Sequence, residues 1–265
     1  MKQLLEIVRG ARVYDLAQPY FTGMPHHPAH PPFLFSLSKQ HGDLTTPGGA
    51  SSAAEAITLG GHVGTHIDAI CHFSCGGKLH GGYEAAQLQS YAGGISQWPV
   101  DGVAPILRRG VLMDIAGQAG VEELAEDFSI APGHLEEACR RQGVDIEAGD
   151  VVLLRTGWAR RWEDAPRYIN QARGPGPELD AARWLSSRKI FAAGSDTIAF
   201  EKVPAADMPV HVHLLVENGI HIVEALNMDQ LARERVYEFL FVAAPLKIRG
   251  GTGSPIRPFA VAATT

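Results

Sequence analysis

The stretch that decides the fold and the chemistry of this chain is GGHVGTHIDAICHF, residues 60–73. It contains four side chains that can bind a metal ion: His62, His66, Asp68 and His72. All four occupy even-numbered positions, so on a β-strand they would point to one face. A straight strand over residues 62–72 would be about 33 Å long, so the four side chains could not meet at one ion. We therefore expect this segment to bend.

The glycines of the stretch make such a bend possible, because Gly60, Gly61 and Gly64 permit sharp turns and close approach of the backbone. A helix is the alternative, since His62 and His66 would then share a face as they do in the His-Glu-x-x-His zinc motif. Gly64 followed by Thr65 disfavours a helix. Asp68 can bind the same ion as His66 or bridge to a second ion.

These residue types are typical of metal sites for hydrolysis, which combine imidazole nitrogens with carboxylate oxygens and leave positions open for water. Any single histidine here would more often be an ordinary core or surface residue. The whole set is harder to explain in that way, because burying these groups unpaired would cost several kcal/mol. Cys71 and Cys75 lack a second cysteine pair, so we interpret them as small buried residues.

Composition excludes several classes of function. The formal net charge of −6 over 265 residues argues against nucleic-acid binding. No apolar run approaches the ~18 residues of a membrane helix. Three cysteines make a disulfide framework improbable, and Glu6 and Arg9 interrupt the opening MKQLLEIVRG, which disfavours a signal peptide. We expect a cytoplasmic protein with a small-molecule substrate and with neither a nucleic acid nor a membrane as partner.

Apolar runs bounded by glycine, proline and aspartate predict alternating strands and helices. The segment 15–32, rich in proline, is expected to be extended. We predict strands at 33–38, 110–116, 150–158, 190–197, 220–226 and 236–246, and helices at 131–143, 178–189 and 208–219. This pattern favours one mixed α/β domain over residues 1–265.

The stretch HVGTHIDAICH resembles the His-x-Gly-Thr-His-x-Asp-x-Pro-x-His signature of the cyclase-like metal-dependent hydrolases. This group includes bacterial kynurenine formamidase, isatin hydrolase and trans-dienelactone hydrolase. Every ligand position matches, and Ile70 stands where the signature has proline. The stretches DLAQPYFTGMPHHPAHPPF, GSDT and HLLVENGIHIVEAL also resemble the family. The resemblance implies a compact α/β domain of the swivelling β/β/α kind that forms a homodimer or homotetramer.

The resemblance also implies roles for individual residues. His62, His66 and Asp68 would hold a first ion, Zn²⁺ or Mn²⁺, and His72 would be the acid/base group. In members with two ions, Asp68 would bridge to a second ion held by His213 and Glu224. Spacing alone does not predict these last two residues as ligands. His211 is the rival to His213, because it points to another face of the same predicted helix.

The implied activity is hydrolysis of a small cyclic amide or lactone by attack of a metal-activated water on its carbonyl. An arylformamidase acting on N-formylkynurenine-like amides is the alternative, and a binding protein without turnover is a third possibility. In the formamidases a tryptophan of the proline-rich segment packs on the substrate ring, and His27 occupies that place here. Together with Phe21 and Phe33, His27 is our candidate for substrate binding.

Overall fold

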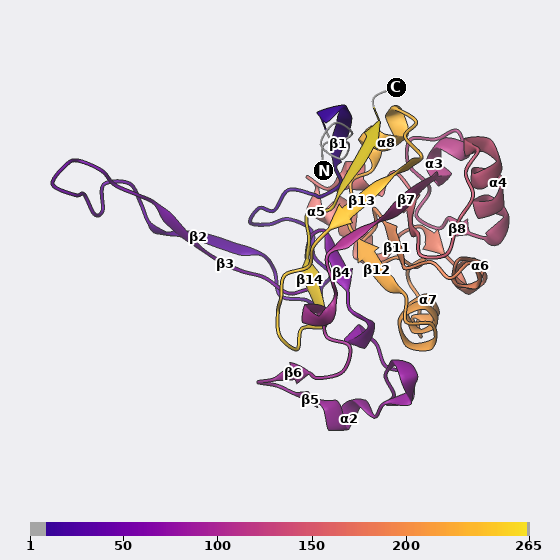
Figure 1. Ribbon diagram of the computed structural model, residues 1–265, viewed down its shortest axis with the longest axis horizontal. Helices are drawn as coiled ribbons and strands as arrows, with labels where there is room; N and C mark the ends of the chain where they lie inside the picture. Colours follow the sequence, from indigo (N-terminus) through magenta and orange to yellow (C-terminus); the bar gives the residue numbers. More distant parts are fainter. Residues whose placement is uncertain (1–8, 264–265) are drawn as a thin grey trace.

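A nine-stranded mixed sheet runs through the body of the molecule (Figure 1). The computed structural model describes residues 9–263, so the expectation drawn from the opening residues 1–8 lies outside the described part. The order across the sheet is β1-β15-β13-β7-β9-β11-β12-β4-β14; β7, β9, β11 and β12 run parallel, and the other pairs are antiparallel. The strands are β1 (Ala11–Asp15), β4 (His66–Asp68), β7 (Ile106–Asp114), β9 (Val151–Arg155), β11 (Ala192–Ser195), β12 (His221–Glu224), β13 (Glu238–Ala243), β14 (Gly253–Pro255) and β15 (Phe259–Ala263).

Side chains alternate along the central strands, so each of these strands contributes apolar residues to a core on each face of the sheet. Val152 and Leu154 of β9 pack toward the helices, whereas Leu153 packs into a second core with Phe241 of β13. The helices are α2 (Ala85–Leu88), α3 (Ile115–Gln118), α4 (Pro132–Gln142), α5 (Ala165–Ile169), α6 (Leu179–Ser187), α7 (Pro209–His211) and α8 (Asp229–Arg233). Helix α7 continues directly into a π-type segment, η6 (Val212–Glu217).

Shorter elements complete the fold. Single 3-10 turns are η1 (Ile70–His72), η2 (His80–Gly82), η3 (Val100–Gly102), η4 (Trp158–Arg161) and η5 (Asn170–Ala172). Three two-stranded sheets pair β2 (Leu34–Lys39) with β3 (Ala54–Thr58), β5 (Gln89–Ser90) with β6 (Gly94–Ile95), and β8 (Ser129–Ile130) with β10 (Gly176–Pro177). No helix among residues 9–263 is long and apolar enough to cross a membrane.

The predicted fold class, a mixed α/β domain, is confirmed. The helix expected at 131–143 is α4, which ends before Gly143 in the left-handed conformation with φ +67°. The strand expected at 110–116 ends sooner than predicted. Asp114 accepts a hydrogen bond from the backbone N–H of Gly117 and so begins α3 at Ile115.

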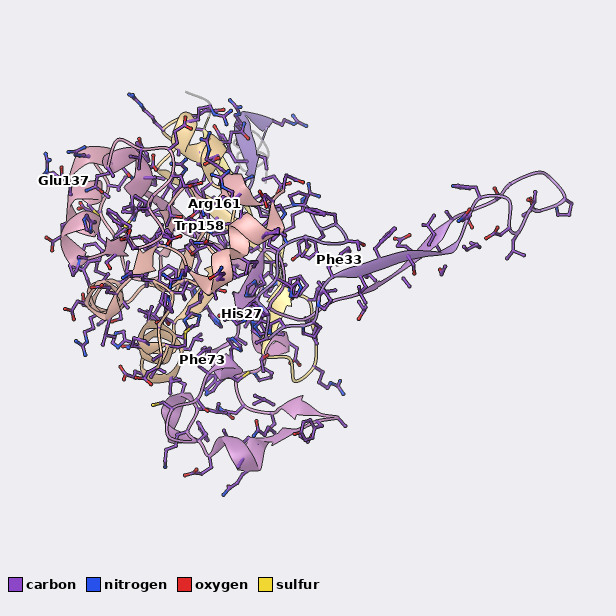
Figure 2. The ribbon with its side chains drawn as sticks, turned by 180° about the vertical axis from the view of Figure 1, so that it is seen from behind. His27, Phe33, Phe73, Glu137, Trp158 and Arg161 are labelled. Carbon is purple, nitrogen blue, oxygen red and sulfur yellow. The ribbon has the colours of Figure 1, made fainter. Side chains whose placement is uncertain are left out.

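Strands β2 and β3 form a long hairpin that projects from the body of the molecule (Figures 1 and 2). We refer to residues 34–58 as the arm. Phe33 lies at its root and packs edge-on against Tyr20, with ring centroids 5.7 Å apart. Residues 40–53 connect the two strands at the far end. The sequence predicts the strand at 33–38 but not a projection of this length.

Candidate metal centre

The 60–73 segment turns sharply before it joins the sheet, as its spacing requires. Gly64 adopts φ +70°, and a Cβ atom there would overlap the ring of Tyr20. The hydroxyl of Tyr20 donates hydrogen bonds to the carbonyls of Val63 and Thr65, at 3.0 and 2.8 Å, and so holds the turn in place. After the turn the chain forms β4 and then η1, which carries His72. The expected bend is therefore present.

Asp68 lies at the centre of the motif and is buried. Its Oδ1 is 2.7 Å from Nδ1 of His62 and 3.5 Å from Nε2 of His66. Its Oδ2 has no hydrogen-bond partner within the described residues. Asp68 belongs to two groups whose donor atoms lie within 4.8 Å of one another: one with His62 and His72, the other with His66 and Glu224.

Glu224 reaches this site through strand pairing. Strand β4 pairs antiparallel with β12, and in that register His66 lies opposite Glu224. Residues directly opposite in an antiparallel pair place their side chains on the same face. One carboxylate oxygen of Glu224 is 3.4 Å from Nε2 of His66, and the other is 3.2 Å from Nε2 of His211. Two segments far apart in sequence thus join at the end of β12.

Hydrogen bonds orient both of these histidine rings. Nδ1 of His66 donates to the carbonyl of Gly64 at 2.8 Å, and Nδ1 of His211 donates to Glu201 at 2.5 Å. In each ring Nε2 is therefore the nitrogen that faces Glu224. A metal-binding histidine is commonly held in this way, by an oxygen that accepts its other N–H.

Neighbouring histidines lower the pKa values of the two buried carboxylates, Asp68 and Glu224. Burial would raise the pKa of Asp68, but the neighbouring imidazoles of His72 and His62 outweigh it and lower this pKa. Burial would likewise raise the pKa of Glu224, but hydrogen bonds from His211 and His66 lower it. Both carboxylates are therefore ionised at neutral pH and available to a cation.

The pKa of His211 is raised, whereas that of His72 is lowered. Burial favours the neutral form of His211, but hydrogen bonds to Glu201 and Glu224 outweigh it and raise the pKa to about 10. Burial lowers the pKa of His72 to about 3, because nearby Asp68 compensates only in part. The ring of His72 stacks on that of His62 with centroids 3.8 Å apart. His72 is thus a neutral imidazole beside the two carboxylates.

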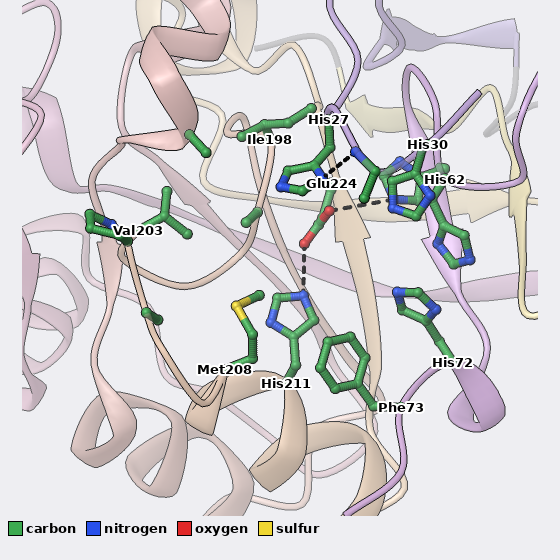
Figure 3. A pocket seen from close by; sticks show the side chains of 16 residues that line it. His27, His30, His62, His72, Phe73, Ile198, Val203, Met208, His211 and Glu224 are labelled. Atoms are coloured by element: carbon green, nitrogen blue, oxygen red, sulfur yellow. Dashed lines mark hydrogen bonds and ion pairs between the residues drawn. The ribbon is translucent and has the colours of Figure 1, made fainter. Parts of the chain in front are cut away.

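The site forms one end of a cavity of about 390 Å³ (Figure 3). Histidines and Glu224 line its polar end, where His30 also stacks on His62 with ring centroids 5.2 Å apart. Burial lowers the pKa of His30 to about 4. The remaining wall is apolar and comes mainly from Phe73, which follows η1, and from residues within 198–208: Ile198, Ala199, Val203, Pro204, Ala205 and Met208.

The structure does not bring His213 to this site. Its Nε2 lies 2.8 Å from Oγ of Ser186 and its Nδ1 2.6 Å from Glu217, outside the cavity. His211 lines the cavity in its place. The two residues are separated by two positions on a helical backbone, so their side chains point in different directions. The placement implied by the resemblance is therefore corrected, in favour of the rival histidine.

The three candidate substrate contacts also separate. His27 lines the cavity. Phe21 and Phe33 do not: both belong to an apolar cluster with Met24 and Trp158, which supports the chain segment leading to His27. Phe33 is buried by this packing. The sequence could not separate these cases, because a buried supporting phenylalanine and a cavity-lining one leave the same signal.

Several site residues escaped the sequence reasoning. His30 is one of three histidines within residues 26–30 of a proline-rich segment, where the sequence gives no signal that separates a cavity-lining histidine from a solvated one. Phe73 directly follows the motif, and its ring lies 4.9 Å from that of His211 between centroids. Glu201 lies in a loop without regular periodicity. The only sequence signal near Glu201 is GSDT, residues 194–197, a stretch that resembles the family.

A family model and several known proteins match this chain. The Cyclase family model, described as "Putative cyclase", matches residues 14–202. The isatin hydrolase of Roseibium aggregatum is 30% identical over 214 residues, which cover 77% of this chain and 73% of that protein. A kynurenine formamidase of Bacillus cereus is 29% identical over 245 residues, 92% of this chain and 94% of that protein.

A crystal structure of a novel cyclase matches with a TM-score of 0.90 at 28% identity, covering 99% of this chain and 90% of that one. The resemblance to the isatin hydrolase and kynurenine formamidase type is confirmed, and so is the expectation of a hydrolase. The family model spans most of the chain, and the chain therefore belongs to the Cyclase family.

Proposed function

We propose that this chain is a metal-dependent hydrolase that opens a small cyclic amide or lactone. The observation that carries the proposal is Asp68, which two groups of donors share and whose Oδ2 is buried without a partner among the described residues. A buried carboxylate oxygen left unsatisfied is costly, and a cation would satisfy it. The nitrogen and oxygen donors fit Zn²⁺ and Mn²⁺ equally.

The residues present could hold one ion or two. His62, His66 and Asp68 form the motif side, and Glu224 with His211 forms the distal side. When bound, such an ion supplies Lewis-acid polarisation of a carbonyl and lowers the pKa of a water molecule. The fixed directions of the His66 and His211 rings orient the donor atoms in advance of binding.

His72 is our candidate acid/base group. Within residues 9–263 no hydrogen bond engages its ring nitrogens, and the ring lines the cavity. As a neutral imidazole it can accept a proton from the attacking water and return it to the leaving nitrogen or oxygen. An amide nitrogen leaves poorly without that proton. The rival role for His72 is a metal ligand, since it stands with His62 and Asp68 in one donor group.

The cavity supports a small, flat substrate. Its volume of about 390 Å³ lies toward the lower end of ligand pockets, and its apolar wall includes Phe73, Ile198 and Val203. A ring placed against that wall would leave its carbonyl at the polar end of the cavity, where a bound ion would polarise it. The relative named isatin hydrolase favours a cyclic amide. The relatives named kynurenine formamidase, which match more of the chain, keep an acyclic formamide as the second candidate.

A substrate panel tests this proposal. The metal-free chain, prepared with a chelator, is supplied with Zn²⁺ or Mn²⁺ and assayed for acid release from isatin, a small aromatic lactone and a formyl anilide. We expect turnover of the cyclic substrates that requires added metal and ceases when the chelator returns. Preference for the formyl anilide would favour the formamidase, and tight metal binding without turnover of any compound would favour a binding protein.

We further propose that the partner of this chain is a second copy of itself, forming a homodimer or a larger homo-oligomer. The arm supports this. In its register Phe35 lies opposite Ile57 and Leu37 opposite Glu55, so three apolar side chains share one face. They are 50%, 60% and 49% exposed for Phe35, Ile57 and Leu37. An isolated two-stranded hairpin is marginally stable in water, and cover from another chain would stabilise it.

Light scattering after size exclusion tests the second proposal. We expect the unmodified chain to elute as an oligomer and the double variant Phe35→Ser with Leu37→Ser to elute mainly as a monomer. Ala56→Ser is the matched control, because Ala56 pairs with Ser36 on the opposite face of the hairpin. A monomeric unmodified chain, or an unchanged oligomer in the double variant, would contradict the proposal.

A further inference from the structure

Glu201 is a buried carboxylate that the chemistry described so far does not use. It lies in the loop between β11 and α7 and is 1% exposed. Its oxygens accept from three donors: Nδ1 of His211 at 2.5 Å, the backbone N–H of His211 at 3.0 Å and that of Val210 at 3.4 Å. His211 lines the cavity, whereas Glu201 is not among the lining residues.

The contact with Nδ1 decides which nitrogen of His211 meets the site. Because Nδ1 donates a hydrogen bond to Glu201, Nε2 is the ring nitrogen that faces Glu224 and the cavity. The backbone bond from His211 to the same Glu201 oxygen also fixes the position of the ring relative to its own main chain. Gly64 performs the corresponding task for His66 with a carbonyl oxygen.

The loop that carries Glu201 is held firmly by its neighbours. A Cβ atom at Gly176 would overlap the backbone of Glu201, so strand β10 lies directly against the loop. The backbone N–H of Lys202 donates to the carbonyl of Pro177 at 3.2 Å. The preceding residue, Phe200, donates its backbone N–H to Glu224 at 2.7 Å. Two adjacent residues of one loop therefore orient two groups of the distal side.

We propose that Glu201 is a positioning residue for metal binding, which holds His211 with Nε2 aimed at the ion. The proposal rests on the metal site advanced above. It concerns the direction of one ring, so it predicts an effect on metal affinity that depends on the presence of His211. Removing such a supporting carboxylate typically weakens metal affinity by about 10- to 100-fold.

A purely structural role is the competing explanation, because Glu201 also accepts from backbone N–H groups at the start of α7. Under that explanation, loss of Glu201 would lower stability whether or not His211 is present, and the affinity of the folded chain for metal would be unchanged. The two explanations therefore differ in what a second substitution at His211 does.

Calorimetric titration of the metal-free chain with Zn²⁺ or Mn²⁺ provides the test. We expect Glu201→Gln to weaken binding of an ion by about 10-fold and Glu201→Ala by up to about 100-fold. Glu217→Gln is the matched control: Glu217 accepts from Nδ1 of His213 at 2.6 Å on the same helical segment, but outside the cavity. This control should bind metal like the unmodified chain.

A double-mutant cycle separates positioning from general stability. In the background of His211→Gln, adding Glu201→Gln should cause no further loss of metal affinity. Thermal unfolding of each metal-free variant identifies any that fails to fold, and the glutamine variants then decide the question. Two results would overturn the role of Glu201 but leave the proposed function intact. One is equal metal affinity in Glu201→Gln and the unmodified chain; the other is a further loss of metal affinity in the double variant as large as that caused by Glu201→Gln alone. Absence of metal binding by the unmodified chain would overturn the proposed function as well.

Discussion

The two sides of the proposed metal centre are built in different ways. The motif side comes from one continuous segment, residues 62–72, whose donors approach one another because the chain bends at Gly64. The distal side is assembled from a loop, a helix and a strand within residues 196–224. Short-range spacing therefore indicates the residues of the motif side. The distal side depends on the direction in which a helical residue faces and on a loop that orients that residue.

We expect the largest effect from a substitution of Asp68, the residue that both sides share. Asp68→Asn preserves the shape of the side chain but removes the charge that His62 and His66 face. We expect hydrolysis to fall by more than about 10³-fold, since water activation by metal is lost. Calorimetry should show loss of ion binding at the same time. Retention of the full metal stoichiometry would show that Asp68 does not join the two sides.

A second substitution separates chemistry from metal binding on the motif side. We expect His72→Ala to lower turnover by about 10²- to 10⁴-fold, the usual contribution of a general acid/base. Ion binding should remain, because His62 and Asp68 are unchanged. Metal content and single-turnover rates measured on the same sample check both points. Loss of the ion in this variant would assign His72 to the rival role of ligand, and unchanged turnover would remove it from the mechanism.

The third prediction compares two histidines of the same helical segment. His211→Ala should weaken ion binding by at least about 10-fold, because Nε2 of His211 is directed at Glu224. His213→Ala should leave ion binding unchanged, since His213 contacts Ser186 and Glu217 instead. Parallel titrations check both. The reverse result would restore the assignment implied by the family resemblance.

His211 and His213 also show which features of the site could be predicted from the sequence. The succession of strands and helices along the chain follows from apolar runs and their glycine and proline boundaries, whereas the order of the strands across the sheet does not. Residue types and spacing indicate the candidate ligands of the motif, and the family resemblance implies their roles. The choice between His211 and His213 does not follow, because α7 ends at His211 and passes into the π-type segment η6, which contains His213 and departs from the regular α-helical period. The role of Glu201 depends on contacts nine and ten residues along the chain, at Val210 and His211, which no periodic pattern reveals.

The smallest expected effect concerns the stability of the motif turn. Gly64→Ala must adopt φ +70° and overlap the ring of Tyr20, so we expect the free energy of unfolding to fall by about 1–3 kcal/mol. Gly76→Ala is the control, because Gly76 also has positive φ, +55°, but faces open space. Urea unfolding of both variants isolates the contribution of Tyr20. Equal losses would show that the contact with Tyr20 does not hold the turn.

The central claim is that both sides bind a common metal centre, and anomalous X-ray scattering from crystals of the Mn²⁺-loaded protein tests it most directly. We predict an anomalous peak adjacent to Asp68 and within bonding distance of donors from His66 or His62 and from Glu224, with a second peak toward His211 if two ions bind. Anomalous density at His213, or none near Asp68 in crystals that contain Mn²⁺, would contradict the claim.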